Sequence, residues 1–105
     1  MANNYKFKGV ALATSAETAL LTAASDETII IRSIRVTNNT SNTPTISLDL
    51  SDSSASAEYT ILKTQTLAAN TAVEIIKVSL VLESSDVLKA TISSSDSIHF
   101  GISYL

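Results

Sequence analysis

The chain has 105 residues, of which 45% are hydrophobic and 16% are charged, and its formal net charge is −3 at pH 7. This length fits one domain spanning residues 1–105. The absence of cysteine excludes disulfides, Cys-ligated metal centres and thiol catalysis. Scattered Lys and Arg in an acidic chain argue against a nucleic-acid partner, and no apolar run approaches the ~18 residues that span a bilayer, so we expect no membrane partner.

Alternation of apolar and polar side chains is the main signal along the chain, and it predicts β-strands. In chain order, the alternating segments are residues 5–8, 28–38, 45–51, 59–63, 73–78, 80–82, 87–93 and 97–105. Turn-forming residues separate them at intervals of about 8–12 residues, the rhythm of a sandwich or barrel. We therefore expect an all-β fold of about eight strands, arranged as a sandwich or a barrel.

Residues 14–24 are the segment in which local propensity points to a helix. They are rich in Ala, Leu and Glu, and Thr14 and Glu17 have the spacing of a capping box. The all-β context of the rest of the chain favours a strand instead, because tertiary pairing can override local propensity. Local propensity alone therefore predicts a helix here, and the all-β context makes a strand the alternative.

The segment 28–38 is a long predicted strand in which the alternation of apolar and polar residues is interrupted once. Its alternation would place Arg32 on the inward-facing side. A β-bulge near Ser33 would shift the phase and turn both Arg32 and Arg35 outward. We expect that bulge.

The predicted turns depend on Ser, Asp and Asn, because the chain has only two glycines and one proline. These side chains hydrogen-bond the neighbouring backbone and tolerate turn geometry. A Ser-Asp pair precedes a predicted strand three times, at residues 25–26, 85–86 and 95–96. We expect these pairs to form turns without glycine.

Catalysis has little support in the sequence. His99 is the only histidine, and serine hydrolysis needs Ser, His and a carboxylate in contact. The nucleophile elbow G-x-S-x-G is absent because the only glycines are Gly9 and Gly101. We predict that His99 faces the surface of a strand and that the chain is not an enzyme.

Metal and cofactor binding have equally little support. The pairs Asp49 with Asp52 and Glu83 with Asp86 offer oxygen ligands that Ca²⁺ can use, but neither follows the EF-hand spacing. Turn formation explains these acids more simply. Glycine-rich phosphate loops are also absent, so we predict no metal site and no cofactor.

A contact with another subunit is the more promising kind of site. Soluble domains average about 25% charged residues, and few Lys or Glu here protect the strand edges. Burial of edges and apolar patches in an assembly would resolve this. The candidate interface residues are Tyr5, Phe7, Arg32, Arg35, Tyr59, Phe100 and Tyr104, since Tyr and Arg are enriched in interfaces. The alternatives are core filling by terminal strands lying side by side, for the aromatics, and surface solubility, for the arginines.

Four segments of the sequence follow one another in an order that is typical of a class of proteins. Residues 19–23 read ALLTA, 25–37 read SDETIIIRSIRVT, 67–91 read LAANTAVEIIKVSLVLESSDVLKAT, and 102–105 read ISYL. Together they resemble a class of small β-sandwich virion proteins of tailed bacteriophages. Asn70 and Ser85 stand where that class usually has Gly. Asn tolerates positive φ, so we expect the turns at these two positions to form without glycine.

With this resemblance added to the strand rhythm, we expect an all-β fold that is an antiparallel β-sandwich, jelly-roll-like, of about eight strands. The resemblance implies a strand at residues 19–23 and no catalytic residues. It implies a capsid decoration (cement) protein, made in the bacterial host cytoplasm and carried in the virion. The partners would be further copies of the chain, with a trimer favoured, and the major capsid protein or other virion proteins. A tail, neck or head/tail-fibre component is one alternative. A carbohydrate-binding β-sandwich module is another, although such modules usually expose aromatic platforms and this chain has no Trp.

Overall fold

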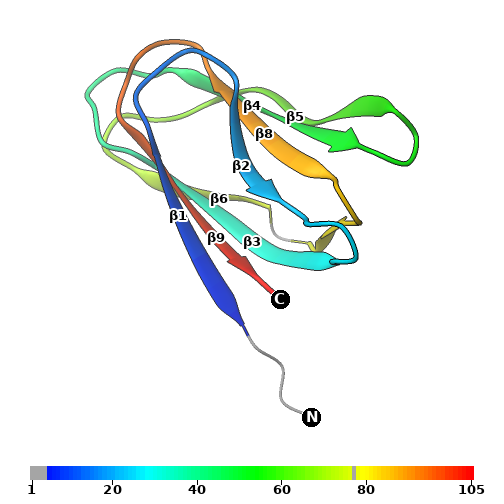
Figure 1. Ribbon diagram of the computed structural model, residues 1–105. Helices are drawn as coiled ribbons and strands as arrows, with labels where there is room; N and C mark the ends of the chain where they lie inside the picture. The colour runs from blue at the N-terminus through cyan, green and yellow to red at the C-terminus, as the bar shows by residue number, and fades with distance from the viewer. Residues whose placement is uncertain (1–4, 77) are drawn as a thin grey trace.

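The computed structural model describes residues 5–76 and 78–105, and in this part the chain forms two antiparallel β-sheets that pack into a sandwich (Figure 1). The strands are β1 (Lys6–Leu12), β2 (Thr18–Thr22), β3 (Ile29–Asn38), β4 (Thr45–Asp52), β5 (Ala57–Thr66), β6 (Ala72–Ile76), β7 (Leu80–Leu82), β8 (Val87–Ile92) and β9 (Ile98–Tyr104). One sheet has the order β1-β9-β3-β6, with β7 also paired to β3, and the other has the order β2-β8-β4-β5. The predicted all-β sandwich is confirmed.

The strand order is that of a jelly roll. The chain passes from one sheet to the other after β1, β2, β3, β5, β7 and β8, which wraps the two sheets around a common core. As a result β9 lies between β1 and β3, and the two terminal strands pair from Lys6↔Tyr104 to Leu12↔Ile98 without a register shift. The expected side-by-side placement of the terminal strands is confirmed (Figure 1).

The core lies between the sheets and follows the predicted alternation. In β9 the inward residues Ile98, Phe100 and Ile102 are buried, whereas His99 between them is exposed. In β8 the buried positions alternate in the same way. Full burial of such a side chain stabilises the fold by about 1.5–3 kcal/mol relative to an exposed one.

Residues 18–22 form a strand and not the helix that propensity alone favours. Leu20 and Leu21 are adjacent yet both are buried, because the register against β8 shifts between Ala19 and Leu21. Such a bulge lets two consecutive residues share one face. Pairing with β8 therefore satisfies the backbone and buries both leucines.

The predicted bulge in β3 is also confirmed. The register against β9 shifts between Ile31 and Ser33, which are the neighbours of Arg32. Ile31 and the next apolar residues are buried, while both arginines are exposed. The extra residue restores the apolar phase and turns Arg32 and Arg35 outward.

Turn residues other than glycine occupy the left-handed backbone region. The described non-glycine residues with positive φ are Asp26 (67°), Ser56 (51°), Thr64 (48°), Asn70 (52°) and Ser85 (68°), and no glycine has positive φ. Asn70 and Ser85 thus adopt the conformation for which glycine is usual, and two of the three predicted Ser-Asp turns contain such a residue. Both glycines lie instead in strands.

Two buried polar residues hold the loops against the sandwich. Asn38, 1% exposed, donates from Nδ2 to the carbonyls of Asn42 (2.8 Å) and Ala68 (3.2 Å), and its Oδ1 accepts from the backbone and hydroxyl of Thr40. The Asp86 carboxylate, 2% exposed, accepts the backbone N–H groups of Ser53 and Glu83, each at 2.9 Å. Buried polar groups of this kind are costly to leave without partners.

Asn38→Ala should therefore destabilise the fold strongly. The substitution leaves the carbonyls of two loops without their donor, and we expect a loss of at least about 2 kcal/mol in the free energy of unfolding. The measurement is urea denaturation, with Asn39→Ala as the matched control. Asn39 is exposed, so its substitution should change stability by less than about 0.5 kcal/mol. Equal effects at the two positions would contradict the role given to Asn38.

Asp96 gives the fold a dependence on acid pH. Hydrogen bonds from the Ser94 hydroxyl and then the Asn42 amide lower the pKa of its carboxyl below the ordinary value. An acid whose pKa falls on folding stabilises the native state above its unfolded pKa and loses this effect as pH falls through the folded pKa. The stability difference between wild type and Asp96→Asn should thus be largest near neutral pH and shrink on acidification. A difference that is constant with pH would contradict this.

Candidate functional site

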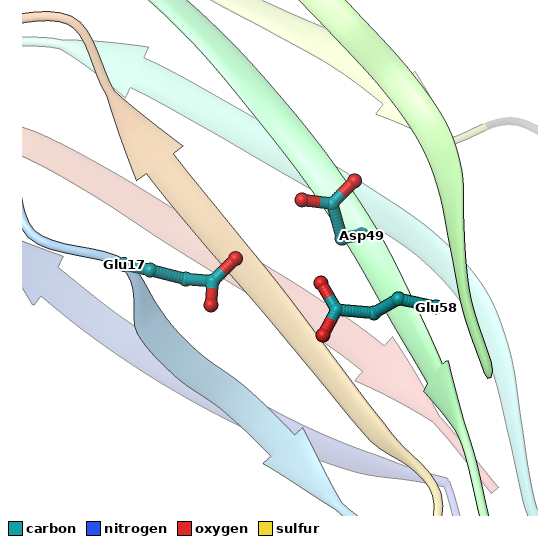
Figure 2. Close-up of side chains that lie close together, drawn as sticks. All are labelled: Glu17, Asp49 and Glu58. Atoms are coloured by element: carbon teal, nitrogen blue, oxygen red, sulfur yellow. The ribbon is translucent and has the colours of Figure 1, made fainter. Parts of the chain in front are cut away.

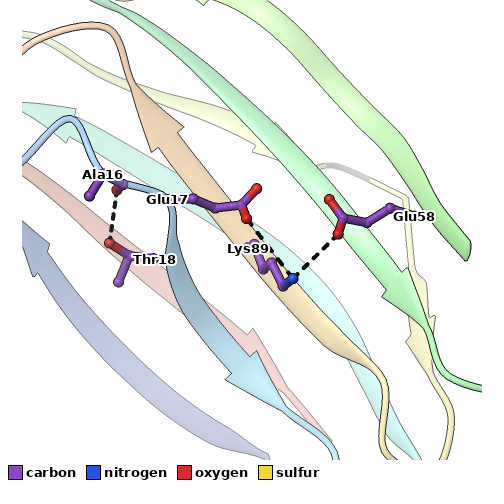
Figure 3. A network of polar contacts seen from close by, with 5 residues as sticks. All are labelled: Ala16, Glu17, Thr18, Glu58 and Lys89. Atoms are coloured by element: carbon purple, nitrogen blue, oxygen red, sulfur yellow. Dashed lines mark hydrogen bonds and ion pairs between the residues drawn. The ribbon is translucent and has the colours of Figure 1, made fainter.

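The two outer faces of the sandwich differ in chemistry. On the four-stranded sheet, one carboxylate oxygen each of Glu17, Asp49 and Glu58 lie within 4.8 Å of one another (Figure 2). Lys89 of β8 is the cross-strand partner of Asp49. The Lys89 Nζ is 3.4 Å from Glu58 and 3.9 Å from Glu17 (Figure 3). This face therefore carries charges that favour contact with water.

A second group of acids sits at the turns that meet near the β4–β5 hairpin. Asp52, Glu83 and Asp86 approach within 4.8 Å, which brings together members of both acidic pairs singled out in the sequence. Asp52 accepts the backbone N–H groups of Ser54 (3.1 Å) and Ala55 (3.3 Å), and Asp86 accepts two more, as described above. The carboxylates of Asp52 and Asp86 thus act as acceptors for turn and loop backbone, the role that turn formation gives to such side chains.

The outer face of the five-stranded sheet is different, and we call it the uncovered face. Its first row is apolar: Leu105 exchanges two backbone hydrogen bonds with Ile30 (2.8 and 3.2 Å), and Ile30 pairs with Val81 of β7. Tyr5, which precedes the paired residue Lys6, extends this row at the β1 edge. Tyr5 is 65% and Val81 48% exposed, so the row is open to solvent.

Phe7 and two glycines form the centre of the uncovered face. Gly9 of β1 and Gly101 of β9 pair directly. A Cβ atom on Gly101 would approach the Phe7 ring to 3.1 Å, and one on Gly9 would approach it to 3.4 Å. The ring therefore lies across the two glycines while remaining 71% exposed. It shields their backbone, in the way an aromatic residue compensates for glycine in a sheet.

A shallow groove of about 620 Å³ runs beside Phe7. Arg35 and Glu74 border it across the strands and form an ion pair at 3.1 Å, and both side chains are largely exposed. His99, Val10, Phe100 and small residues of β1, β3 and β9 line the remainder. The uncovered face thus combines an apolar row, an exposed ring and a glycine-floored groove with one ion pair.

The structure brings only some of the predicted interface residues together. Tyr5, Phe7 and Arg35 lie on the uncovered face, and Arg32 is exposed at the bulge of β3. Tyr59 is 51% exposed but belongs to β5 of the other sheet. The remaining two face inward: Phe100 is 1% exposed in the core, and Tyr104 is partly buried against it. Of the two alternatives for the aromatics, core filling therefore describes Phe100 and Tyr104 but not Tyr5 and Phe7.

Several members of the uncovered face were not singled out in the sequence. They are Gly9, Ile30, Glu74, Val81, Gly101 and Leu105. Each lies far along the chain from its neighbour across the sheet, as Arg35 does from Glu74. Only the strand register places them side by side, and no local motif encodes that register. His99 is exposed on its strand, as predicted.

No protein-family model matches the chain, and no match occurs among curated proteins or solved structures. Within residues 5–76 and 78–105, no helix is long and apolar enough to cross a membrane. The function is therefore inferred from the uncovered face and from the sequence resemblance.

The contact between Phe7 and Gly101 predicts an energetic coupling. In a Phe7→Ser background, Gly101→Ala should stabilise the strand by about 0.5–1 kcal/mol, since Ala loses less backbone entropy than Gly. With Phe7 present the added methyl displaces the ring, so the gain should be smaller or reversed. Urea denaturation of the four proteins of this double-mutant cycle measures the coupling, and strict additivity would contradict the contact.

Proposed function

We propose that the chain is a structural virion protein of a tailed bacteriophage, a capsid decoration protein that stabilises the shell through subunit contacts. The observation that carries the proposal is the uncovered face, because the largest contiguous exposed apolar patch on a monomeric protein is often functional. The quoted sequence segments, which resemble small phage virion proteins, supply the biological setting. The partners would be copies of the chain, a trimer being favoured by the resemblance, and the major capsid protein.

The mechanism would be passive. A protein that binds the assembled shell but not its separated subunits shifts the equilibrium towards the shell by mass action. Many copies acting together add their contributions, so a modest affinity per copy is sufficient. Within the same class, a tail, neck or fibre component would use the same kind of contact at another place in the particle.

A carbohydrate-binding module is the second candidate function, and one observation favours it. The Phe7 ring is exposed beside a groove that offers hydrogen-bonding groups from Arg35, Glu74 and His99, and sugar sites combine aromatic platforms with such groups. The apolar row of Ile30, Val81 and Leu105 fits a protein contact better, since these side chains offer a sugar no hydrogen bond.

The decisive experiment compares phage particles with and without this protein. Particles assembled without it should lose heat or pressure resistance, and adding back the purified protein should restore it. Particles given protein with Phe7→Ser should recover less than particles given protein with Tyr59→Ser, the matched control. Unchanged resistance without the protein would overturn the decoration role, and counting copies per particle would then distinguish a shell position from a tail position.

A further inference from the structure

We propose that the uncovered face docks on the same face of a second copy of this chain, sheet against sheet. This inference rests on the proposed function to the extent that both use one surface, and it assigns that surface to a pair of chains where the resemblance favours a trimer. Its evidence is the row Tyr5, Leu105, Ile30 and Val81 together with the groove beside Phe7.

The chemistry of the two outer faces decides which surface of the second copy fits. The outer face of the four-stranded sheet presents Lys89 among Glu17, Asp49 and Glu58. Covering those charges with the apolar row would desolvate them without new partners, at a cost of several kcal/mol per ion. Apolar row against apolar row removes only hydrocarbon and aromatic surface from water, which is favourable.

The charges of the uncovered face do not oppose a contact between two copies. The groove is bordered by one cation and one anion, Arg35 and Glu74, which lie side by side on neighbouring strands and pair with each other. A two-fold axis along the strands, between β9 and β3, places this pair opposite the partner's β9 and β1, so like charges of the two copies do not meet.

The shape of the face supports the same arrangement. The Phe7 ring lies across the glycine pair of β1 and β9, and the groove beside it extends to Arg35 of β3 and Glu74 of β6. A two-fold axis along the strands, between β9 and β3, places the ring of each copy over the groove of the other.

The size of the face predicts a weak contact. Four strands at about 4.8 Å spacing and about seven residues at ~3.3 Å each give a flat footprint of roughly 450 Å². Standard interfaces bury about 800 Å² per partner, and weak or transient ones fall below about 600 Å². We therefore expect a dissociation constant in the micromolar range or above in free solution. Association should be tighter where copies are held close together.

Sedimentation equilibrium over the micromolar range and above, on the full chain, tests the proposal. The average mass should rise from the 11.1 kDa of one chain with increasing concentration. Val81→Lys should weaken the association about tenfold or more, because it places a charge in the apolar row. Val73→Lys is its matched control: Val73 is 41% exposed in the same sheet but pairs with the buried Val36 on the inward row.

A second pair of variants distinguishes weaker association from loss of folding. Tyr5 lies outside the paired strands, and the substitution Tyr5→Ser should weaken association. The substitution Tyr59→Ser, on the other sheet, should not. Circular dichroism confirms that each variant is folded. A wild-type chain that stays monomeric throughout, or a dimer that the Val73 and Tyr59 variants weaken and the Val81 and Tyr5 variants do not, would overturn the inference.

The remaining outcomes separate this inference from the proposed function. A monomer that binds phage particles through a Val81-sensitive contact would overturn self-docking and leave the decoration role intact. A monomer that binds a glycan, with binding lost in Phe7→Ser, would overturn both. A dimer sensitive to Val81→Lys with no affinity for particles would support self-docking and contradict the decoration role.

Discussion

A two-layer sandwich buries one face of each sheet and leaves the other face to water or to a partner. This constraint organises the molecule, because the buried residues between the sheets are almost entirely aliphatic and the two outward faces have to differ from them. The four-stranded sheet meets the constraint with Lys89 and three carboxylates. The five-stranded sheet does not: its outward face carries Phe7, two glycines and an apolar row. We interpret that asymmetry as the functional feature of the chain.

The jelly-roll topology places this face where an assembly can use it. The pairing of β1 with β9 brings both terminal strands into the five-stranded sheet, so Tyr5 and Phe7 from one end of the chain meet Leu105 and Gly101 from the other. The turns that close the sandwich depend on Asn38, Asp86 and polar residues at positive φ. These internal hydrogen bonds hold the loops at the ends of the sandwich in place.

The sequence predicted the strands well because alternation reports directly on burial. It located the β3 bulge from the phase of Arg32, and it anticipated that Asn70 and Ser85 would replace glycine in turns. It could not say that Phe7 points outward, since alternation shows which residues share a face but not which face is inward. Lys6 and Lys8 occupy the inward-facing row of β1, because Val10 and Leu12 continue that row opposite Phe100 and Ile98. The groove was equally hidden, because Gly9 meets Gly101, and Arg35 meets Glu74, only through register.

The central claim is that the uncovered face is buried in the assembled state. The chain has no cysteine, so Val81→Cys and Val73→Cys each introduce a single thiol at a partly exposed strand position. The most direct measurement is the rate at which maleimide labels each variant. It compares a concentrated sample, in which the chains are assembled, with a diluted sample, in which they are separate. The account predicts that assembly slows labelling at position 81 and leaves position 73 unchanged. Equal rates at position 81 in both states would contradict it.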